Sequence, residues 1–222
     1  GRLGLLLALL GWSNNNGGGP GIMELMSRCL KNGVDLASAR GYKTASKIIQ
    51  VILRIGREPP NGLASPGYIT WAIDGLHART RMLMTLGVPL GIFIFPGGFG
   101  TLEEEGATLT DDQLYGMIVT ALIYQVPIFF VDFPLPDNGH WVSPILELRR
   151  RMVDFKCASN SATQNHFERH EIMSIADPSS IDKAVRRMDE AHKYLYGFSA
   201  LAKFEEQHGK SVFDVANELL PH

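Results

Sequence analysis

A glycine-rich turn followed by a carboxylate is the feature of this sequence with the clearest chemical use. The segment Pro96-Gly97-Gly98-Phe99-Gly100-Thr101, the second glycine turn of the chain, follows an apolar run, and Glu104 comes shortly after it. Glycines let the backbone approach a ligand closely and accept positive φ angles. The first N–H groups of a helix that begins there are unpaired, and the helix dipole adds partial positive charge. A strand, a glycine turn and a helix in this order predict a phosphate-binding site, although a tight structural turn is the alternative interpretation.

The carboxylates beside this turn also have two interpretations. Glu103, Glu104 and Glu105 stand in the first turn of the expected helix. Acidic side chains there stabilise a helix through its dipole. A carboxylate next to a bound phosphate is nevertheless electrostatically unfavourable unless it takes part in the chemistry.

A first glycine turn lies near the amino terminus. Gly17-Gly18-Gly19-Pro20-Gly21 is followed by apolar residues at helical spacing, which predicts that this turn also opens a helix. Two such turns in one domain suggest two walls of one crevice around a nucleotide.

The two turns resemble the markers of one family. The segment from Pro96 to Glu104 is similar to the PGGxGTxxE signature of the Lonely-guy family of cytokinin-activating phosphoribohydrolases, and Gly17 to Glu24 resembles its GGGxGxM turn. The similarity covers roughly residues 14–135, and Glu58-Pro59-Pro60-Asn61 and Ile94 to Gly98 are closest to the bacterial nucleotide 5′-monophosphate nucleosidases. The resemblance implies hydrolysis of the N-glycosidic bond of a nucleoside 5′-monophosphate to free base and ribose 5-phosphate. It implies no metal or organic cofactor.

The resemblance also assigns roles to residues. Glu104 matches one of the family's two catalytic residues and Arg81 the other, with Arg79 as a close competitor if two residues are inserted near Gly87 to Pro89. The arginine would hold the phosphate or the ribose hydroxyls and keep Glu104 ionised. The carboxylate would stabilise positive charge on the ribose and activate water. The predicted substrate-binding residues are Gly97, Gly98, Phe99, Gly100, Thr101, Thr110, Gly18, Gly19, Glu58 and Met82.

The chain departs from the family pattern in three places. Met82 stands where a lysine often follows the arginine, and Ala107 replaces a second glutamate. Ser13-Asn14-Asn15-Asn16 stands where the end of a β-branched strand is expected, which predicts a degraded first strand. We therefore expect activity to be reduced or redirected.

The elements that must position these residues alternate between strands and helices. Strands are predicted at residues 48–53, 91–95, 127–133 and 171–176; helices are predicted after Gly21, at residues 74–86 and 101–124, from Ser143 with that serine as N-cap, after Asp177-Pro178, and at residues 199–220. Such alternation implies crossover units and a parallel sheet whose ligands sit at the carboxyl ends of strands. The predicted fold is one Rossmann-like α/β domain over residues 1–222, with a motif-bearing core at about 14–135 and a C-terminal helical part at about 178–222.

Composition narrows the class of protein. A net charge of −2, from 21 basic and 23 acidic residues, does not favour a nucleic-acid partner. Residues 3–10, which follow Arg2, are apolar, and residues 1–10 are expected to be part of a first structural element rather than a signal peptide. No other segment has the roughly 18 apolar residues of a membrane helix. Two isolated cysteines, Cys29 and Cys157, fit a reducing compartment, so a cytoplasmic location is expected. Arg149-Arg150-Arg151 is expected to be a solvated helix face.

A binding protein is the main alternative to an enzyme. Molybdenum-cofactor carriers have a similar fold and glycine turns, and they hold a phosphorylated pterin without cleaving it. A carrier does not need a carboxylate such as Glu104 beside the sugar. The Lonely-guy resemblance also implies a homo-oligomer, whereas the identity of the base stays open.

Overall fold

The computed structural model describes two compact units. One contains residues 1–87 and 198–222, and the other contains residues 88–197. The described residues are 1–53, 61–63, 69–75, 78–79, 82–83, 89–96, 126–133, 141–155, 170–174 and 177–220. Each unit has a three-stranded parallel sheet, so the predicted α/β class with parallel strands is confirmed. The single domain predicted for residues 1–222 stays a prediction.

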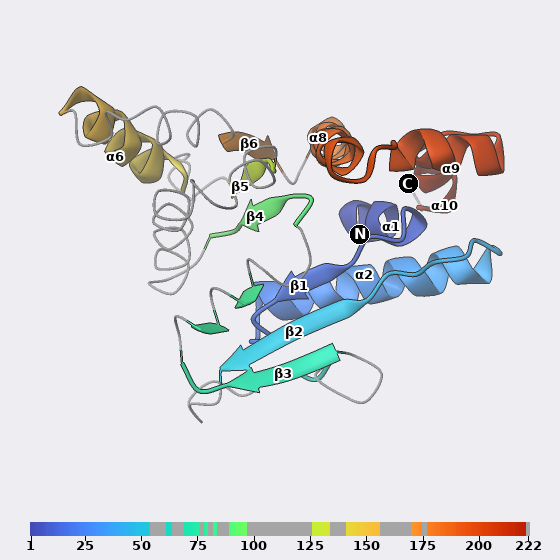
Figure 1. Cartoon of the computed structure of the whole chain (residues 1–222), viewed down its shortest axis with the longest axis horizontal. Coiled ribbons are helices and arrows are strands. Elements are labelled where there is room, and N and C mark those ends of the chain that lie inside the picture. Colours follow the sequence, from blue (N-terminus) through green and yellow to red (C-terminus); the bar gives the residue numbers. More distant parts are fainter. Residues whose placement is uncertain are drawn as a thin grey trace. The chain divides into compact units, whose positions relative to one another are not determined.

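The sheet of the first unit has the order β1-β2-β3 (Figure 1). Its strands are β1 (Asn14–Asn16), β2 (Ile48–Leu53) and β3 (Ile69–Ile73). Where a degraded or incompletely represented first strand was expected, Asn14 to Asn16 form a strand of three residues that pairs in parallel with Ile48 to Gln50. Strand β3 was not predicted, although Ile69-Thr70-Trp71 consists of residues that favour strands.

Helices α1 (Arg2–Leu9) and α2 (Ile22–Ala39) approach each other at backbone distance. A methyl group added to Gly33 would lie 2.5 Å from the carbonyl oxygen of Gly4. A methyl group on Gly4 would lie 2.3 Å from the carbonyl oxygen of Cys29. Helix α1 is buried from Leu3 to Leu9, which confirms that the apolar start of the chain is a structural element. Helix α2 in turn packs against β1 and β2 (Figure 1).

Two helices, rather than the single helix predicted at residues 199–220, end the described chain. They are α9 (Ala200–His208) and α10 (Val212–Leu219). Gly209 adopts a left-handed conformation (φ 69°) that terminates α9, and Ser211 caps α10 by accepting a 3.2 Å bond from the Asp214 N–H. A helix that ends at such a glycine and restarts at a serine cap cannot be continuous.

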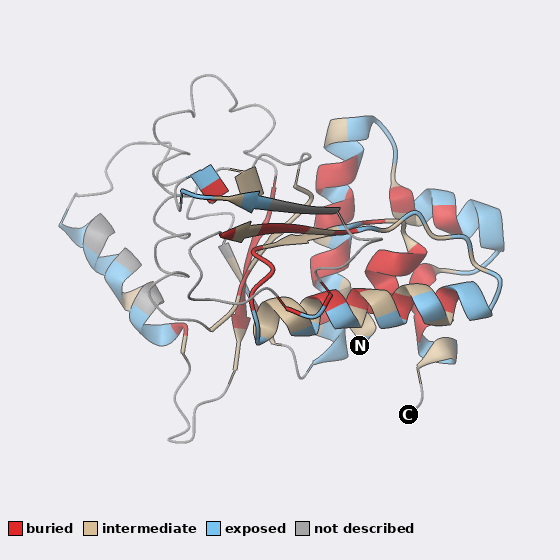
Figure 2. Cartoon of the chain, turned by 90° about the horizontal axis from the view of Figure 1, so that it is seen from below, coloured by how far each residue is buried: buried red, intermediate tan, exposed pale blue. Residues whose placement is uncertain are grey.

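The sheet of the second unit has the order β4-β5-β6. Its strands, β4 (Ile92–Ile94), β5 (Ile128–Asp132) and β6 (His170–Ser174), lie within a few residues of the predicted ones. Ile94, Ile128, Phe130 and Val142 form a buried apolar cluster. Helix α8 (Pro178–Tyr196) packs against β6 and begins, as predicted, with Asp177 as its cap and Pro178 in its first turn. Buried residues, red in Figure 2, make up most of β2 and of β5.

Helix α6 (Ser143–Asp154) carries a solvated charged face. It begins at Ser143 itself, so this residue is not the N-cap that was predicted. Arg150 pairs with Glu147 at 2.9 Å and with Asp154 at 2.6 Å, and Arg151 pairs with Glu147 at 2.7 Å. For Arg150 and Arg151 the predicted solvated face is confirmed, since both side chains are exposed. None of the helices that the structure describes is both long enough and apolar enough to cross a lipid bilayer.

Candidate functional site

Most of the predicted site residues lie outside the described part of the chain. They are Glu58, Arg81, Gly97, Gly98, Phe99, Gly100, Thr101, Glu104 and Thr110. The roles assigned to them stay predictions. The structure does describe the first glycine turn with Gly18 and Gly19, and it describes Arg79 and Met82.

The first glycine turn joins the carboxyl end of β1 to the amino terminus of α2. Gly18 and Gly21 have positive φ angles of 68° and 74°, which side chains other than glycine rarely adopt. Gly21 is the N-cap of α2 and offers no side-chain cap, and the first helical bond runs from the Leu25 N–H to the Gly21 carbonyl. The N–H groups that precede that bond are those that bind anions at the start of a helix.

Hydrogen bonds from polar side chains on both sides fix the conformation of this turn. The Gly18 N–H donates to Asn16 Oδ1 at 2.8 Å, and Asn16 Nδ2 donates to Ser27 Oγ at 2.9 Å. From the other side, the Asn61 N–H donates to the Gly18 carbonyl at 2.8 Å, and Asn61 Nδ2 donates to the Gly19 carbonyl at 3.0 Å. The turn is therefore fixed both from its own strand and from the segment that follows β2.

Gln50, in the middle of β2, supports Asn61. Its Nε2 donates to Asn61 Oδ1 at 3.1 Å, and the same oxygen accepts a 3.0 Å bond from the Leu63 N–H. The Gln50 side chain is completely buried, and its Oε1 has no hydrogen-bond partner within the described ranges. A buried acceptor without a partner costs free energy and calls for a physical explanation.

Arg79 brings positive charge to the first glycine turn. Its side chain is only 6% exposed. A methyl group on Gly17 would lie 3.1 Å from Arg79 Nη1 and 2.9 Å from Met23 Sδ. The guanidinium therefore lies directly against the start of the turn. Its planar fork of N–H donors matches the oxygens of a phosphate or a carboxylate.

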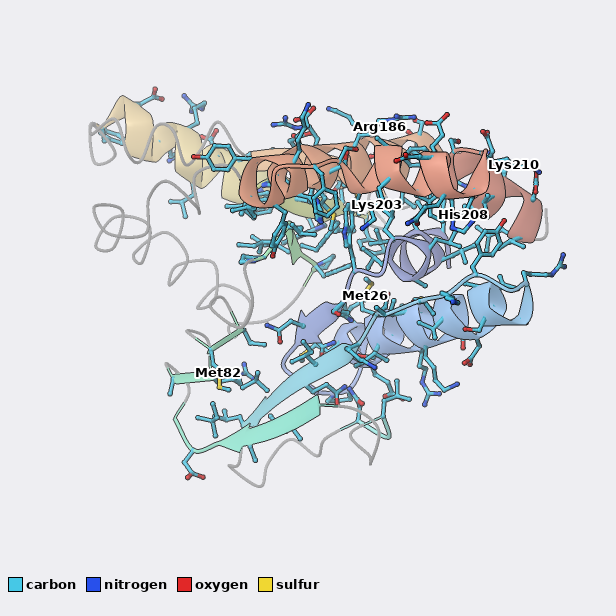
Figure 3. The ribbon with its side chains drawn as sticks, turned by 45° about the vertical axis from the view of Figure 1, so that its right-hand side comes forward. Met26, Met82, Arg186, Lys203, His208 and Lys210 are labelled. Carbon is cyan, nitrogen blue, oxygen red and sulfur yellow. The ribbon has the colours of Figure 1, made fainter. Side chains whose placement is uncertain are left out.

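The segment that carries Met82 is attached to the same end of the sheet. Asn15 Nδ2, on β1, donates to the Leu83 carbonyl at 2.7 Å. Figure 3 shows Met82, a half-buried residue, beside the carboxyl ends of β2 and β3. Residues 78–79 and 82–83 are helical, whereas Asp74 and Gly75 are not, so this helix begins later than predicted.

The hydrogen-bond network around Asn61 and Gln50 was not predicted. Gln50 stands alone in the apolar run Ile48-Ile49-Gln50-Val51-Ile52-Leu53, and a polar residue at the centre of a buried parallel strand was the available signal. Asn61 ends the Glu58-Pro59-Pro60-Asn61 segment and was noted only as part of the resemblance.

This arrangement suits an anionic ligand. Helix amides, glycines that admit a close approach and a guanidinium lie at the carboxyl end of a parallel strand, where ligands of α/β proteins bind. The one acidic residue in the first turn of α2, Glu24, is paired with Arg28 at 2.9 Å. No group of three or more side chains suited to hold a metal ion occurs among the residues whose positions the structure gives.

Comparison with protein-family models and with curated protein sequences finds no match. The resemblance to the Lonely-guy family therefore rests on the sequences of the two glycine turns and stays a prediction.

Proposed function

We propose that this protein hydrolyses the N-glycosidic bond of a nucleoside 5′-monophosphate, as the Lonely-guy phosphoribohydrolases do. The observation that carries the proposal is the buried Arg79 guanidinium against Gly17, at the turn that opens α2. The resemblance of the two glycine turns supplies the reaction class. It also supports a cytoplasmic homo-oligomer.

The proposed reaction breaks the bond between C1′ of the ribose and the nitrogen of the base. Water adds its hydroxyl to C1′ and its proton to the base, so the products are ribose 5-phosphate and free base. Positive charge develops on the ribose as the bond breaks, and Glu104 is proposed to stabilise it and to orient the water.

Arg79 is proposed to be the arginine that binds the anionic substrate. A buried guanidinium beside a glycine turn can donate two hydrogen bonds to one phosphate or to adjacent ribose hydroxyls. The fixed turn holds the substrate, and it contributes binding energy to the substrate and to the transition state alike. Arg81 lies outside the described residues, so its role as the catalytic arginine stays a prediction. The experiment below tests both arginines.

The test is a panel of purine and pyrimidine monophosphates and their nucleosides, with release of ribose 5-phosphate or ribose as the measurement. We expect release from at least one monophosphate and none from the matching nucleoside. Glu104→Ala should lower kcat by about 10²- to 10⁴-fold. Arg79→Met should lower kcat/KM by about 10- to 100-fold, the range of a hydrogen bond to a charged group.

Arg81→Met is the matched control, because it removes the same group two positions along the chain. A larger loss for Arg81→Met than for Arg79→Met would reverse the assignment of the two arginines. Release that survives Glu104→Ala would refute the mechanism. Tight binding of a monophosphate without release would instead favour the carrier.

A further inference from the structure

We propose that Asn61, supported by Gln50, is a positioning residue that fixes the first glycine turn in its substrate-binding conformation. This inference rests on the function proposed above and extends it to residues that do not touch the substrate.

Asn61 binds two successive carbonyls of the turn. Its N–H donates to the Gly18 carbonyl at 2.8 Å, and its side-chain Nδ2 donates to the Gly19 carbonyl at 3.0 Å. One residue therefore satisfies the carbonyls of both peptides that follow Gly18 and Gly19. Both carbonyls must point toward Asn61.

The direction of these carbonyls determines the direction of the adjoining amide. None of the described peptide bonds is cis, and in a trans peptide the C=O and the N–H point in opposite directions. Because the Gly18 carbonyl faces Asn61, the Gly19 N–H points away from it. The next peptide bond joins Gly19 to Pro20. Because Pro20 has no N–H, the only polar group of this peptide is the Gly19 carbonyl, which Asn61 already binds. Within the described part of the chain, no hydrogen bond of the Gly19 N–H occurs, so its direction is set by the carbonyl that Asn61 holds.

Gln50 keeps the Asn61 side chain in the orientation this requires. Asn61 Oδ1 accepts from Gln50 Nε2 at 3.1 Å and from the Leu63 N–H at 3.0 Å, so Nδ2 must be the group that faces Gly19. Gln50 is completely buried and Asn61 is 5% exposed. Buried and mutually bonded, the two amides have little freedom to rotate.

Gln50 also packs closely against the turn at Gly18. A methyl group on Gly18 would lie 3.3 Å from Gln50 Cβ. The turn thus rests on the strand next to its own. A buried polar side chain whose Oε1 has no partner among the described residues is an unfavourable choice for the centre of a strand, and its bond to Asn61 gives it the role of holding that residue.

The test measures binding of ribose 5-phosphate by calorimetry, together with kcat and KM for a monophosphate that the protein hydrolyses. Asn61→Ala should weaken binding of ribose 5-phosphate by about tenfold or more, in the range of a hydrogen bond to a charged group. KM should rise by a similar factor with kcat nearly unchanged, because the turn binds substrate and transition state alike. Gln50→Met removes the bond that supports Asn61, together with a longer 3.5 Å bond to Ser27 Oγ, and should weaken binding by a smaller factor.

Ser46→Ala is the control, because Ser46 Oγ donates to the Leu7 carbonyl at 3.1 Å, away from the turn in the same unit. It should lower the unfolding temperature without changing the affinity for ribose 5-phosphate. Equal affinity of Asn61→Ala and the parent would overturn this inference and leave the proposed function intact. If Asn61→Ala does not fold, the affinity of Gln50→Met for ribose 5-phosphate is compared with that of the parent instead, and equal affinity overturns the inference. Absence of binding and hydrolysis in the parent protein would instead refute the proposed function, and this inference with it.

Discussion

The central strands of the two sheets differ in what they bury. In β5 the residues from Ile128 to Val131 are all buried and apolar. In β2, the equally central strand of the other sheet, Gln50 is completely buried between apolar neighbours. An apolar strand gains free energy from every side chain removed from water, whereas a buried amide gains little unless all its bonds are made.

Gln50 thus distinguishes the central strand of the first sheet from the wholly apolar centre of β5. The amide in β2 lies beneath a glycine turn and, through Asn61, holds it in place. The centre of β5 is apolar instead, and its Ile128 and Phe130 belong to one buried cluster with Ile94 and Val142. The first unit therefore gives up apolar burial at the position where Asn61 and the first glycine turn are supported.

The largest effect on stability is expected from Phe130→Ala in β5. Phe130 is 1% exposed and belongs to the buried cluster of its unit. Removing a buried aromatic ring leaves a cavity and should lower the free energy of unfolding by about 3–5 kcal/mol, measured in urea. Phe155→Ala is the matched control, because Phe155 is 76% exposed in the same unit and should cost less than about 0.5 kcal/mol. Similar losses for the two variants would contradict the role given to β5.

An intermediate effect is expected where α1 and α2 meet. Gly33→Ala places a methyl group 2.5 Å from the Gly4 carbonyl, and backbone atoms cannot move aside without separating the helices. The net loss should be about 1–3 kcal/mol, despite the better helix propensity of alanine. The exposed neighbour Asn32→Ala keeps the propensity gain without the clash and should be neutral or slightly stabilising. A stable Gly33→Ala would show that the two helices are less closely packed.

The sequence predicted the fold best where one signal was strong. The apolar run of β5 and the Asp177-Pro178 cap of α8 were located to within a few residues, because burial on both faces and cap chemistry are local signals. The three asparagines of β1 have low strand propensity, and only the pairing with β2 makes them a strand. Tertiary pairing of this kind is not visible in a local window of sequence.

The candidate site shows the same limit. The glycines of the first turn were predicted from their pattern, and two of them adopt the positive φ angles that require glycine. Gln50 and Asn61 were not predicted, because their role depends on hydrogen bonds between segments that are distant in sequence. The contact between Arg79 and Gly17 likewise joins residues that no spacing rule connects.

The smallest effect is expected on the surface of the second unit, at Glu147. Hydrogen bonds from Arg150 and Arg151 lower the pKa of this carboxyl from 4.5 to about 2. Because the pKa in the folded protein is below the unfolded value, the stabilisation is complete above about pH 4.5 and is lost as the pH falls toward 2. Glu147→Gln should therefore lower the unfolding temperature slightly at neutral pH, and the difference from the parent should disappear near pH 2. The effect should also shrink in about 1 M NaCl, since all three side chains are exposed and salt screens them. A difference that persists at low pH and high salt would mean that Glu147 acts through packing, which would make this helix face part of the core rather than a solvated surface.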